Sequence, residues 1–196
     1  MGLAGTVAGG GGPAYAATAH AALESSALHN FPDNAVINCM CHSTENLYHF
    51  SDTALARASD DFYPRDPASS AAHITACAYN SVFLGPLVQP DWDMFHSKHA
   101  AGHMHAVARA VSGGPVYTSD QPGMHDVELL RSLAFADGTV LRCSRPARPT
   151  ARCLFADVRK DGKTVLVLQN VNVCTAVLAA INVQGSWWDR GLRRFV

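Results

Sequence analysis

Short apolar runs alternate with alanine-rich segments over most of the chain, and this alternation constrains the fold more than any other feature. Residues 15–29 are rich in Ala and Leu and predict a helix, and the apolar run at residues 35–41 predicts a buried strand. Residues 98–111 predict another helix, which the Ser-Gly-Gly sequence after it would end. Strands that alternate with helices are typical of a parallel sheet with helical crossovers. The sequence therefore predicts an α/β fold.

The remaining predicted elements extend this pattern until about Cys143, where the pattern changes. Strands are expected at residues 53–58, 82–89 and 115–120, and helices at residues 69–83 and 124–135. Two strand-like runs then follow with short polar turns, at residues 163–171 and 175–184, and these predict an antiparallel β segment. We therefore expect three parts, which are a flexible glycine-rich segment at residues 1–14, an α/β domain at residues 15–142 and the beginning of a β domain at residues 143–196.

The composition describes a globular chain with a large core and argues against several classes of partner. Hydrophobic residues make up 48% of the 196 residues and charged residues only 16%, which argues against disorder. Fifteen Lys and Arg against 16 Asp and Glu give a net charge of -1, so nucleic-acid binding is not expected. No run of about 18 uninterrupted apolar residues is present, so no membrane span is expected. Six cysteines without regular spacing predict free buried thiols in a reducing compartment.

Carboxylates gather directly after predicted strands. Asp60 and Asp61 follow the strand at residues 53–58, within the stretch RASDDFYPRDP. In an α/β barrel, the face at the C-terminal ends of the strands is where the catalytic residues assemble. A Ser-Asp-Asp sequence by itself would instead favour a solvated turn that caps the following helix. Further polar clusters follow the next predicted strands, at Asp91-Trp92-Asp93 and at Ser119-Asp120.

Five strings in the sequence resemble one family of plant enzymes. They are RASDDFYPRDP, AYNSVFLG, QPDWDMFHS, ARAVSGGPVYTSD and DGTVLR. In order and spacing they are similar to the raffinose synthase and alkaline α-galactosidase family, also called seed imbibition proteins, over about residues 31–185. The resemblance implies a (β/α)8 barrel followed by an antiparallel β domain. It matches this chain to the fifth to eighth βα units, the C-terminal half of the barrel, and to the beginning of the β domain.

The resemblance implies an enzyme that acts on α-galactosides by a retaining mechanism, with raffinose, galactinol and sucrose as substrates and no cofactor. Such an enzyme needs two carboxyl groups, a nucleophile and an acid/base. Asp60 matches the acid/base position of the family. Trp92 would offer a ring face to a sugar, and the equally weighted alternative is a core anchor. The implied substrate-binding residues are Arg57, Asp61, Arg65, Asp91, Trp92, Asp93 and Asp120.

The resemblance places the nucleophile in a Lys-Val-Asp motif upstream of the helix at residues 15–29, and no aspartate precedes Asp33 in this chain. We therefore expect a fragment without the nucleophile, with weak or absent catalysis by itself. The alternative is a non-catalytic remnant that binds sugar weakly or not at all. Unpaired edges of a half barrel would favour self-association. The expected location is the cytoplasm, with the plastid left open.

Histidines offer a competing chemistry, a metal site. His99 and His103 are four residues apart on a predicted helix, and His96 and His105 lie nearby in the sequence. The segment lacks the glutamate that metalloproteases carry between two such histidines, and the chain contains no Cys-x-x-Cys. We therefore expect no native metal, and expect these histidines to lie on the surface or in a groove.

Overall fold

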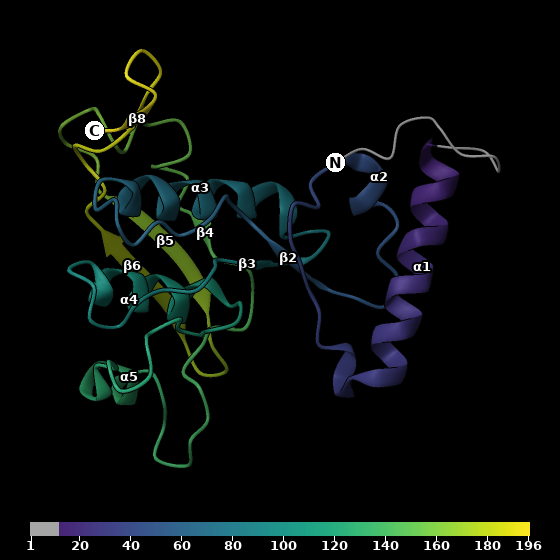
Figure 1. Ribbon diagram of the computed structural model, residues 1–196. Coiled ribbons are helices and arrows are strands. Elements are labelled where there is room, and N and C mark those ends of the chain that lie inside the picture. The colour runs from purple at the N-terminus through teal and green to yellow at the C-terminus, as the bar shows by residue number, and fades with distance from the viewer. Residues whose placement is uncertain (1–11) are drawn as a thin grey trace. The chain divides into compact units, whose positions relative to one another are not determined.

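The computed structural model describes residues 12–196, and the chain divides into two compact units, residues 1–57 and 58–196 (Figure 1). The expected glycine-rich segment at residues 1–14 lies mostly outside the described residues, and its last three residues begin the first helix. The domain boundary expected at residue 143 lies inside the C-terminal unit, and the expected division into an α/β and a β domain stays a prediction.

The N-terminal unit consists of one long helix and short elements that follow it. Two of the short elements are strands that pair in parallel, with Ile37 opposite Leu55 and Asn38 opposite Ala56. Ser43 caps the short helix between the strands by accepting a hydrogen bond from the Asn46 N–H at 3.3 Å. The elements are α1 (Gly12–Asn30), η1 (Pro32–Asn34), β1 (Ile37–Asn38), α2 (Thr44–Leu47) and β2 (Leu55–Arg57).

Helix α1 forms because alanine favours a helical backbone, yet the helix has no broad apolar face. Its buried residues are only Ala16, Glu24 and Ala27. The buried Glu24 carboxylate accepts hydrogen bonds from the backbone N–H groups of residues 51, 52 and 53, at 3.1 to 3.2 Å, and from the Thr53 hydroxyl. One carboxylate therefore organises the turn that leads the chain into β2.

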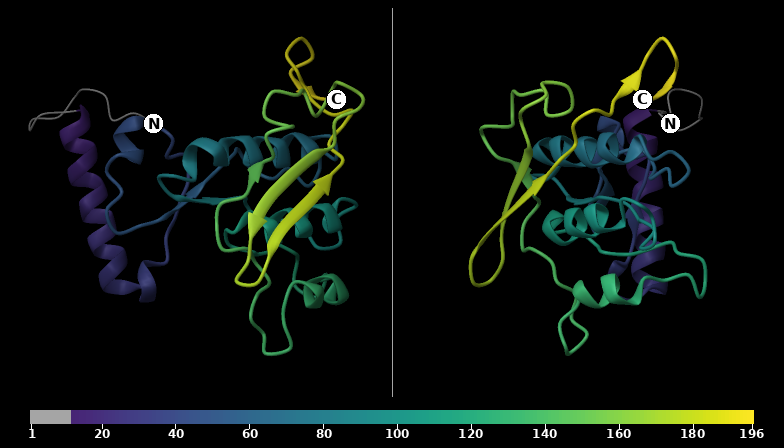
Figure 2. Two further views of the ribbon diagram at one scale, coloured as in Figure 1. Left: turned by 180° about the vertical axis from the view of Figure 1, so that it is seen from behind. Right: turned by 90° about the vertical axis from the view of Figure 1, so that its left-hand side faces the viewer.

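The C-terminal unit contains three helices and the remaining strands. Strands β5 and β6 form an antiparallel hairpin, with Leu166 opposite Ile181 and Val171 opposite Ala176. This hairpin packs against α4, and β4 packs against α3 (Figure 2). The elements are α3 (Ser69–Leu84), β3 (Gln89–Asp91), α4 (Gly102–Ser112), α5 (Val127–Ser132), β4 (Arg148–Pro149), β5 (Leu166–Val171), β6 (Ala176–Ile181), β7 (Trp188–Asp189) and β8 (Arg194–Phe195).

Gly113 ends helix α4 in a conformation and a space that only glycine fits well. Its φ of +78° lies in the left-handed region, where side chains cause strain. A Cβ at this position would lie 2.0 Å from the carbonyl oxygen of Arg145. The close approach brings the chain before β4 against the end of α4. The Asn170 side chain closes the same junction by donating to the carbonyl oxygens of Val111 and Arg145, at 2.6 and 2.5 Å.

The α/β prediction is confirmed, because helices alternate with parallel strands before an antiparallel hairpin. The helix at residues 15–29 and the strands at residues 53–58, 163–171 and 175–184 are present with small shifts of their ends. The strand expected at residues 35–41 is shorter, because only Ile37 and Asn38 pair.

Three other predicted elements need correction. The prediction of a strand at residues 82–89 is wrong, because α3 continues to Leu84. Ala78, Ser81 and Leu84 keep one face of this helix buried. The next strand begins only at Gln89, after Pro86, which cannot donate to a ladder. The strand expected at residues 115–120 is reduced to one parallel bridge between Phe95 and Thr118. The helix expected at residues 124–135 forms only at α5.

All six cysteines carry free thiols, as expected, although Cys39 and Cys174 are exposed and not buried. Within residues 12–196, no helix has the length and apolar character needed to cross a membrane.

Replacement of Glu24 by glutamine tests the role of this carboxylate. Burial by itself raises the pKa of Glu24, but the hydrogen bonds from residues 51–53 outweigh it and hold this pKa below its ordinary value of 4.5. A lowered carboxyl pKa stabilises the folded state above the unfolded pKa, and this stabilisation is lost as the pH falls through the folded pKa. We expect Glu24→Gln to lower the unfolding free energy at pH 7 by about 1–3 kcal/mol, and the deficit to shrink in acid.

Denaturant unfolding at several pH values measures this effect, and amide hydrogen exchange at residues 51–53 locates it. The control is Glu45→Gln, which removes the same charge from a half-buried residue in α2 without these backbone contacts. Equal stability of the Glu24→Gln variant and the unaltered chain at pH 7 would contradict the assignment.

Candidate active site

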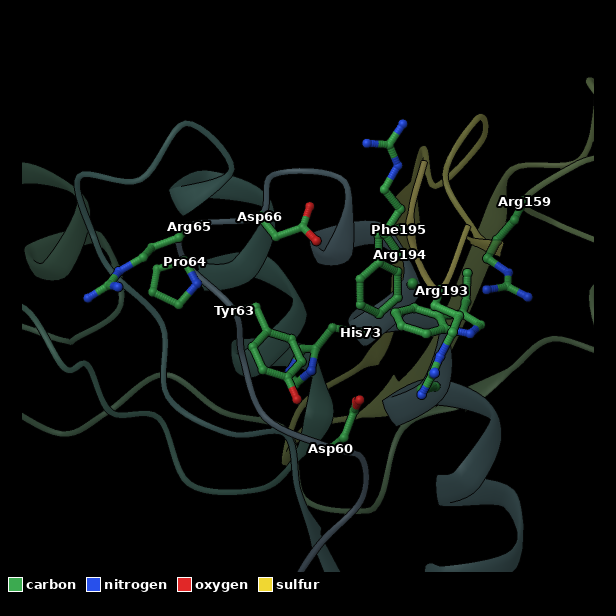
Figure 3. A pocket seen from close by; sticks show the side chains of 13 residues that line it. Asp60, Tyr63, Pro64, Arg65, Asp66, His73, Arg159, Arg193, Arg194 and Phe195 are labelled. Atoms are coloured by element: carbon green, nitrogen blue, oxygen red, sulfur yellow. The ribbon is translucent and has the colours of Figure 1, made fainter. Parts of the chain in front are cut away.

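A pocket of about 980 Å³ lies in the C-terminal unit, and Asp60 is one of the residues that line it (Figure 3). One wall is the segment that follows Asp60, another is the beginning of α3, and the third is the hairpin of β7 and β8. The lining residues are Asp60, Tyr63, Pro64, Arg65, Asp66, Ala72, His73, Ala76, Arg159, Trp188, Arg193, Arg194 and Phe195. Residues far apart in sequence therefore build one concave site.

Asp60 combines access to solvent with a raised pKa. Its side chain is exposed, and its carboxyl group points into the pocket in Figure 3. Partial burial raises the pKa of this carboxyl, and the neighbouring charges of Asp61 and Asp93 raise it further. A carboxyl group that holds its proton more strongly than usual is suited to donate that proton and take it back.

The Asp93 side chain holds the backbone that follows Asp60 in place. Its carboxylate is buried and accepts hydrogen bonds from the backbone N–H groups of Phe62 and Met94, both at 2.7 Å. Asp93 itself has a φ of +67°, a left-handed conformation that aspartate tolerates better than most residues. The buried Phe62 ring belongs to the core of the unit with Phe95, so the chain two residues after Asp60 is anchored by both side chain and backbone.

Arg109 in turn holds Asp93. This fully buried arginine donates from Nε to the Asp93 carbonyl at 3.1 Å and from a terminal nitrogen to the Met94 carbonyl at 3.2 Å. Its other terminal nitrogen donates to His105 Nδ1 at 2.6 Å, because arginine has no acceptor. Burial and the Arg109 charge lower the pKa of His105 to about 2, so this imidazole stays neutral beside the guanidinium.

Tyr63 lies next to Asp60 in the pocket. Partial burial raises the pKa of its hydroxyl, and the charges of Asp60 and Asp61 add to this effect. The Tyr63 ring lies 6.4 Å from the Phe195 ring, and the Trp188 ring lies 5.0 Å from Phe195. The pocket therefore combines the Asp60 carboxyl with three aromatic rings.

The structure brings together only some of the predicted catalytic and substrate-binding residues. Asp60 and Arg65 line the pocket, whereas Asp61 is exposed next to Asp60 and does not line it. Asp120 lies elsewhere, where it accepts a hydrogen bond from the Ser97 N–H at 2.8 Å. Arg57 is buried at the end of β2 as the last residue of the N-terminal unit.

The segment of Asp91, Trp92 and Asp93 is buried and does not face the pocket. The structure favours the core alternative for Trp92, because its ring is completely enclosed and its indole nitrogen donates to the Ser81 hydroxyl at 3.0 Å. Asp91 is also completely buried and accepts a hydrogen bond from the Tyr117 hydroxyl at 2.9 Å. These side chains support the site from within the core, and sugar contact by Trp92 stays a prediction.

Sequence reasoning missed most of the aromatic and basic lining. Tyr63 carried a signal, because it lies three residues after Asp60 in the same motif. His73 follows in α3 without any motif of its own. Trp188 and Phe195 are more than 120 residues downstream of Asp60, and only the folded chain shows that they share its pocket.

Neither the histidines nor the buried Cys77 thiol forms a second reactive site among the residues that the structure describes. Within residues 12–196, no three His, Cys, Asp or Glu side chains are grouped to hold a metal ion. His99 lies before α4 begins, so it does not share a helix face with His103 as the sequence predicted. The Cys77 thiol lies 3.8 Å from His73 Nε2, but full burial raises its pKa to about 12. Such a thiol is not available as a nucleophile.

Comparison with known proteins assigns the chain to a family. Residues 4–196 match the family described as raffinose synthase or seed imbibition protein Sip1, and the chain belongs to this family. A probable galactinol–sucrose galactosyltransferase 6 of Arabidopsis thaliana is 55% identical over 175 residues, which are 89% of this chain and 23% of that protein.

Two further relatives extend this comparison. A galactinol–sucrose galactosyltransferase of Oryza sativa subsp. japonica is 47% identical over 183 residues, which cover 89% of this chain and 23% of the relative. A stachyose synthase of Pisum sativum is 39% identical over 184 residues, which cover 88% of this chain and 21% of the relative. The chain thus spans less than a quarter of the length of these relatives.

The charge of Asp93 can be removed to test its effect on Asp60. We expect Asp93→Asn to lower the pKa of Asp60, because one of the two like charges that raise it is lost. The pKa should stay above the ordinary value, since partial burial is the largest cause of the shift. The variant should also unfold more easily, because the amide nitrogen of asparagine cannot accept the backbone hydrogen bond that it replaces.

Carbon-13 NMR titration of the Asp60 carboxyl measures this shift. Asp137→Asn, at an exposed position outside the pocket, is the matched control and should leave the titration of Asp60 unchanged. An Asp60 titration that is identical in Asp93→Asn and in the unaltered chain would show that Asp93 has no electrostatic effect on it.

Proposed function

We propose that the pocket of this chain carries the acid/base side of a retaining α-galactosyl transfer site. The observation that carries this proposal is the Asp60 carboxyl, which combines exposure to the pocket with a raised pKa in a chain of the raffinose synthase family. The relatives named as galactinol–sucrose galactosyltransferases suggest galactinol as the galactosyl donor and sucrose as the acceptor. Hydrolysis, with water as the acceptor, uses the same groups.

In the proposed reaction, Asp60 acts twice. In its protonated form the carboxyl donates a proton to the oxygen that leaves the galactosyl group. As a carboxylate it then takes a proton from the acceptor hydroxyl, or from water, that attacks the glycosyl intermediate. The raised pKa supports the first step, because more of the carboxyl is protonated before the reaction begins.

The pocket supplies one of the two carboxyl groups that this reaction needs. Asp66 is the other carboxylate among the lining residues, and in the view of Figure 3 it lies above the Tyr63 ring, whereas Asp60 lies below it. A retaining pair requires carboxyl groups about 5 Å apart on either side of the reacting bond. We assign Asp60 the acid/base role and assign no nucleophile among the lining residues, because the chain contains no Lys-Val-Asp sequence.

The fold that we propose follows from the match of this chain to the raffinose synthase family. The helices and parallel strands up to α5 would form the C-terminal half of a (β/α)8 barrel, and β4 to β8 would begin an antiparallel β domain. The alternation of elements and the antiparallel β5–β6 hairpin support this proposal. A half barrel would leave strand edges open, which favours self-association of the chain.

The chain by itself should show little or no turnover. We expect no hydrolysis of p-nitrophenyl α-galactoside and no transfer from galactinol to sucrose above the level of Asp60→Asn. Loss of one member of a catalytic unit costs on the order of a hundred-thousandfold in rate. Absence of turnover would also fit the second candidate function, a pocket that binds sugar without catalysis. Robust turnover that Asp60→Asn abolishes would contradict the expectation that this chain lacks a nucleophile.

A chimera tests the role of Asp60 where a nucleophile can be supplied. This chain replaces the matched segment of the rice galactinol–sucrose galactosyltransferase, and galactosyl transfer from galactinol to sucrose is measured. We expect Asp60→Asn to lower kcat by roughly 10²- to 10⁴-fold, the usual contribution of general acid–base catalysis. Asp66→Asn serves as the matched control in the same pocket. An active chimera that tolerates Asp60→Asn within twofold would refute the proposal.

A second assay with the chimera separates the two steps. With p-nitrophenyl α-galactoside, whose leaving group needs no proton, Asp60→Gly should still form the glycosyl intermediate but lose the base for its breakdown. Azide, which attacks without a base, should restore turnover and yield the α-galactosyl azide. Failure of azide to increase the rate would show that Asp60 is not the acid/base.

A further inference from the structure

We propose that Tyr63, Trp188 and Phe195 form the wall of an acceptor subsite that binds a neutral sugar beside Asp60. This inference rests on the proposed acid/base role of Asp60. An acid/base carboxyl faces the oxygen between the galactosyl group and its leaving group, so the space beyond it holds the leaving group and then the acceptor. Tyr63, Trp188 and Phe195 line the same pocket as Asp60, and we assign them to this space.

The three rings form a continuous surface made by two segments. Trp188 and Phe195 lie directly opposite each other in the β7–β8 ladder, and their rings meet edge to face at 5.0 Å and 73°. Tyr63 extends this surface from the Asp60 segment, with its ring 6.4 Å from that of Phe195. Trp188 is 47% exposed and Tyr63 42% exposed, so both rings offer apolar area to a ligand.

Only one of the two adjacent tryptophans belongs to the wall. Successive side chains of a strand point to opposite faces, and Trp187 lies against the Lys160 ammonium group, 4.6 Å from its ring centroid. Trp187 does not line the pocket, whereas Trp188 does. The alternation in the hairpin therefore directs one ring toward Asp60 and the other away from it.

Hydrogen bonds tie the hairpin to the body of the unit. The Ser186 hydroxyl donates to the Ala68 carbonyl, immediately before α3 begins. The Gly185 N–H donates to the Arg159 carbonyl at 2.8 Å. Because α3 follows the Asp60 segment directly, these contacts place the wall with respect to the carboxyl. A site whose rings are positioned before the ligand arrives is typical of a binding pocket.

The charges of the pocket favour a neutral ligand over an anion. Four arginines and two carboxylates line it, which would at first suggest a site for a phosphate. Figure 3 shows, however, that the guanidinium groups of Arg65 and Arg194 point away from the centre of the pocket and do not converge on one point. These two arginines therefore do not form a shared anion site with Arg159 and Arg193. Rings with polar groups around them fit a hydroxyl-rich, uncharged sugar instead.

Binding of sucrose to the full 196-residue chain tests the proposal. Saturation-transfer NMR and isothermal titration measure its dissociation constant. We expect saturable binding, which Trp188→Ala and Phe195→Ala each weaken at least tenfold. Phe155→Ala is the matched control, because this ring is 99% exposed and does not line the pocket, and it should change binding less than twofold.

Tyr63→Ala repeats the test on a different element if a hairpin variant melts at a clearly lower temperature than the unaltered chain. Inorganic phosphate and glucose 6-phosphate are titrated in parallel. Tighter binding of either anion than of sucrose would overturn the neutral-sugar assignment. Absence of sucrose binding to the unaltered chain, or equal binding by all the aromatic variants, would overturn the subsite.

The sucrose-binding experiment and the chimera experiment can fail independently of each other. No sucrose binding together with an Asp60-dependent chimera would remove the subsite and leave the acid/base role intact. Ring-dependent sucrose binding together with an Asp60-independent chimera would refute the acid/base role, and with it the function of the wall as an acceptor subsite.

Discussion

The buried carboxylate of Asp93 is the interaction on which the candidate site depends. It accepts the backbone N–H of Phe62 at 2.7 Å, and that residue follows Asp60 by only two positions. Arg109 holds the carbonyl of Asp93 in turn, and the neutral imidazole of His105 accepts a hydrogen bond from Arg109. These contacts fix the backbone next to the exposed Asp60 carboxyl, so core packing defines where this proposed acid/base group lies.

Asp93 has a second effect, because its charge raises the pKa of Asp60. The same side chain therefore contributes to the position of the carboxyl and to its affinity for a proton. Two different properties of the site are thus linked through one residue, and a substitution at Asp93 alters both. The pKa of Arg109 is subject to two opposing effects. Burial lowers it, whereas the nearby carboxylates of Asp93 and Asp91 raise it.

The sequence predicted the elements that local composition decides and missed those that tertiary contacts decide. The helix at residues 15–29 and the hairpin strands after residue 163 follow from local composition. The strand at residues 82–89 failed because the buried face of α3 extends to Leu84, which local apolarity cannot distinguish from a strand. For the site, a family motif indicated Asp60, whereas Trp188 and Phe195 could not be found because no local pattern connects them with residue 60.

Two properties of the pocket come from two different segments of the chain, one of which is the β7–β8 hairpin. Asp60, the proposed proton-transfer group, belongs to a segment held by the core. Two of the three rings belong to a two-stranded hairpin near residue 190, whose turn contains Arg193 in a left-handed conformation. Substitutions or length changes in that turn would reshape the aromatic surface without disturbing the contacts of Asp93. Under the proposed function, a change in this one short hairpin would alter the choice of sugar while the acid/base chemistry of Asp60 stays unchanged.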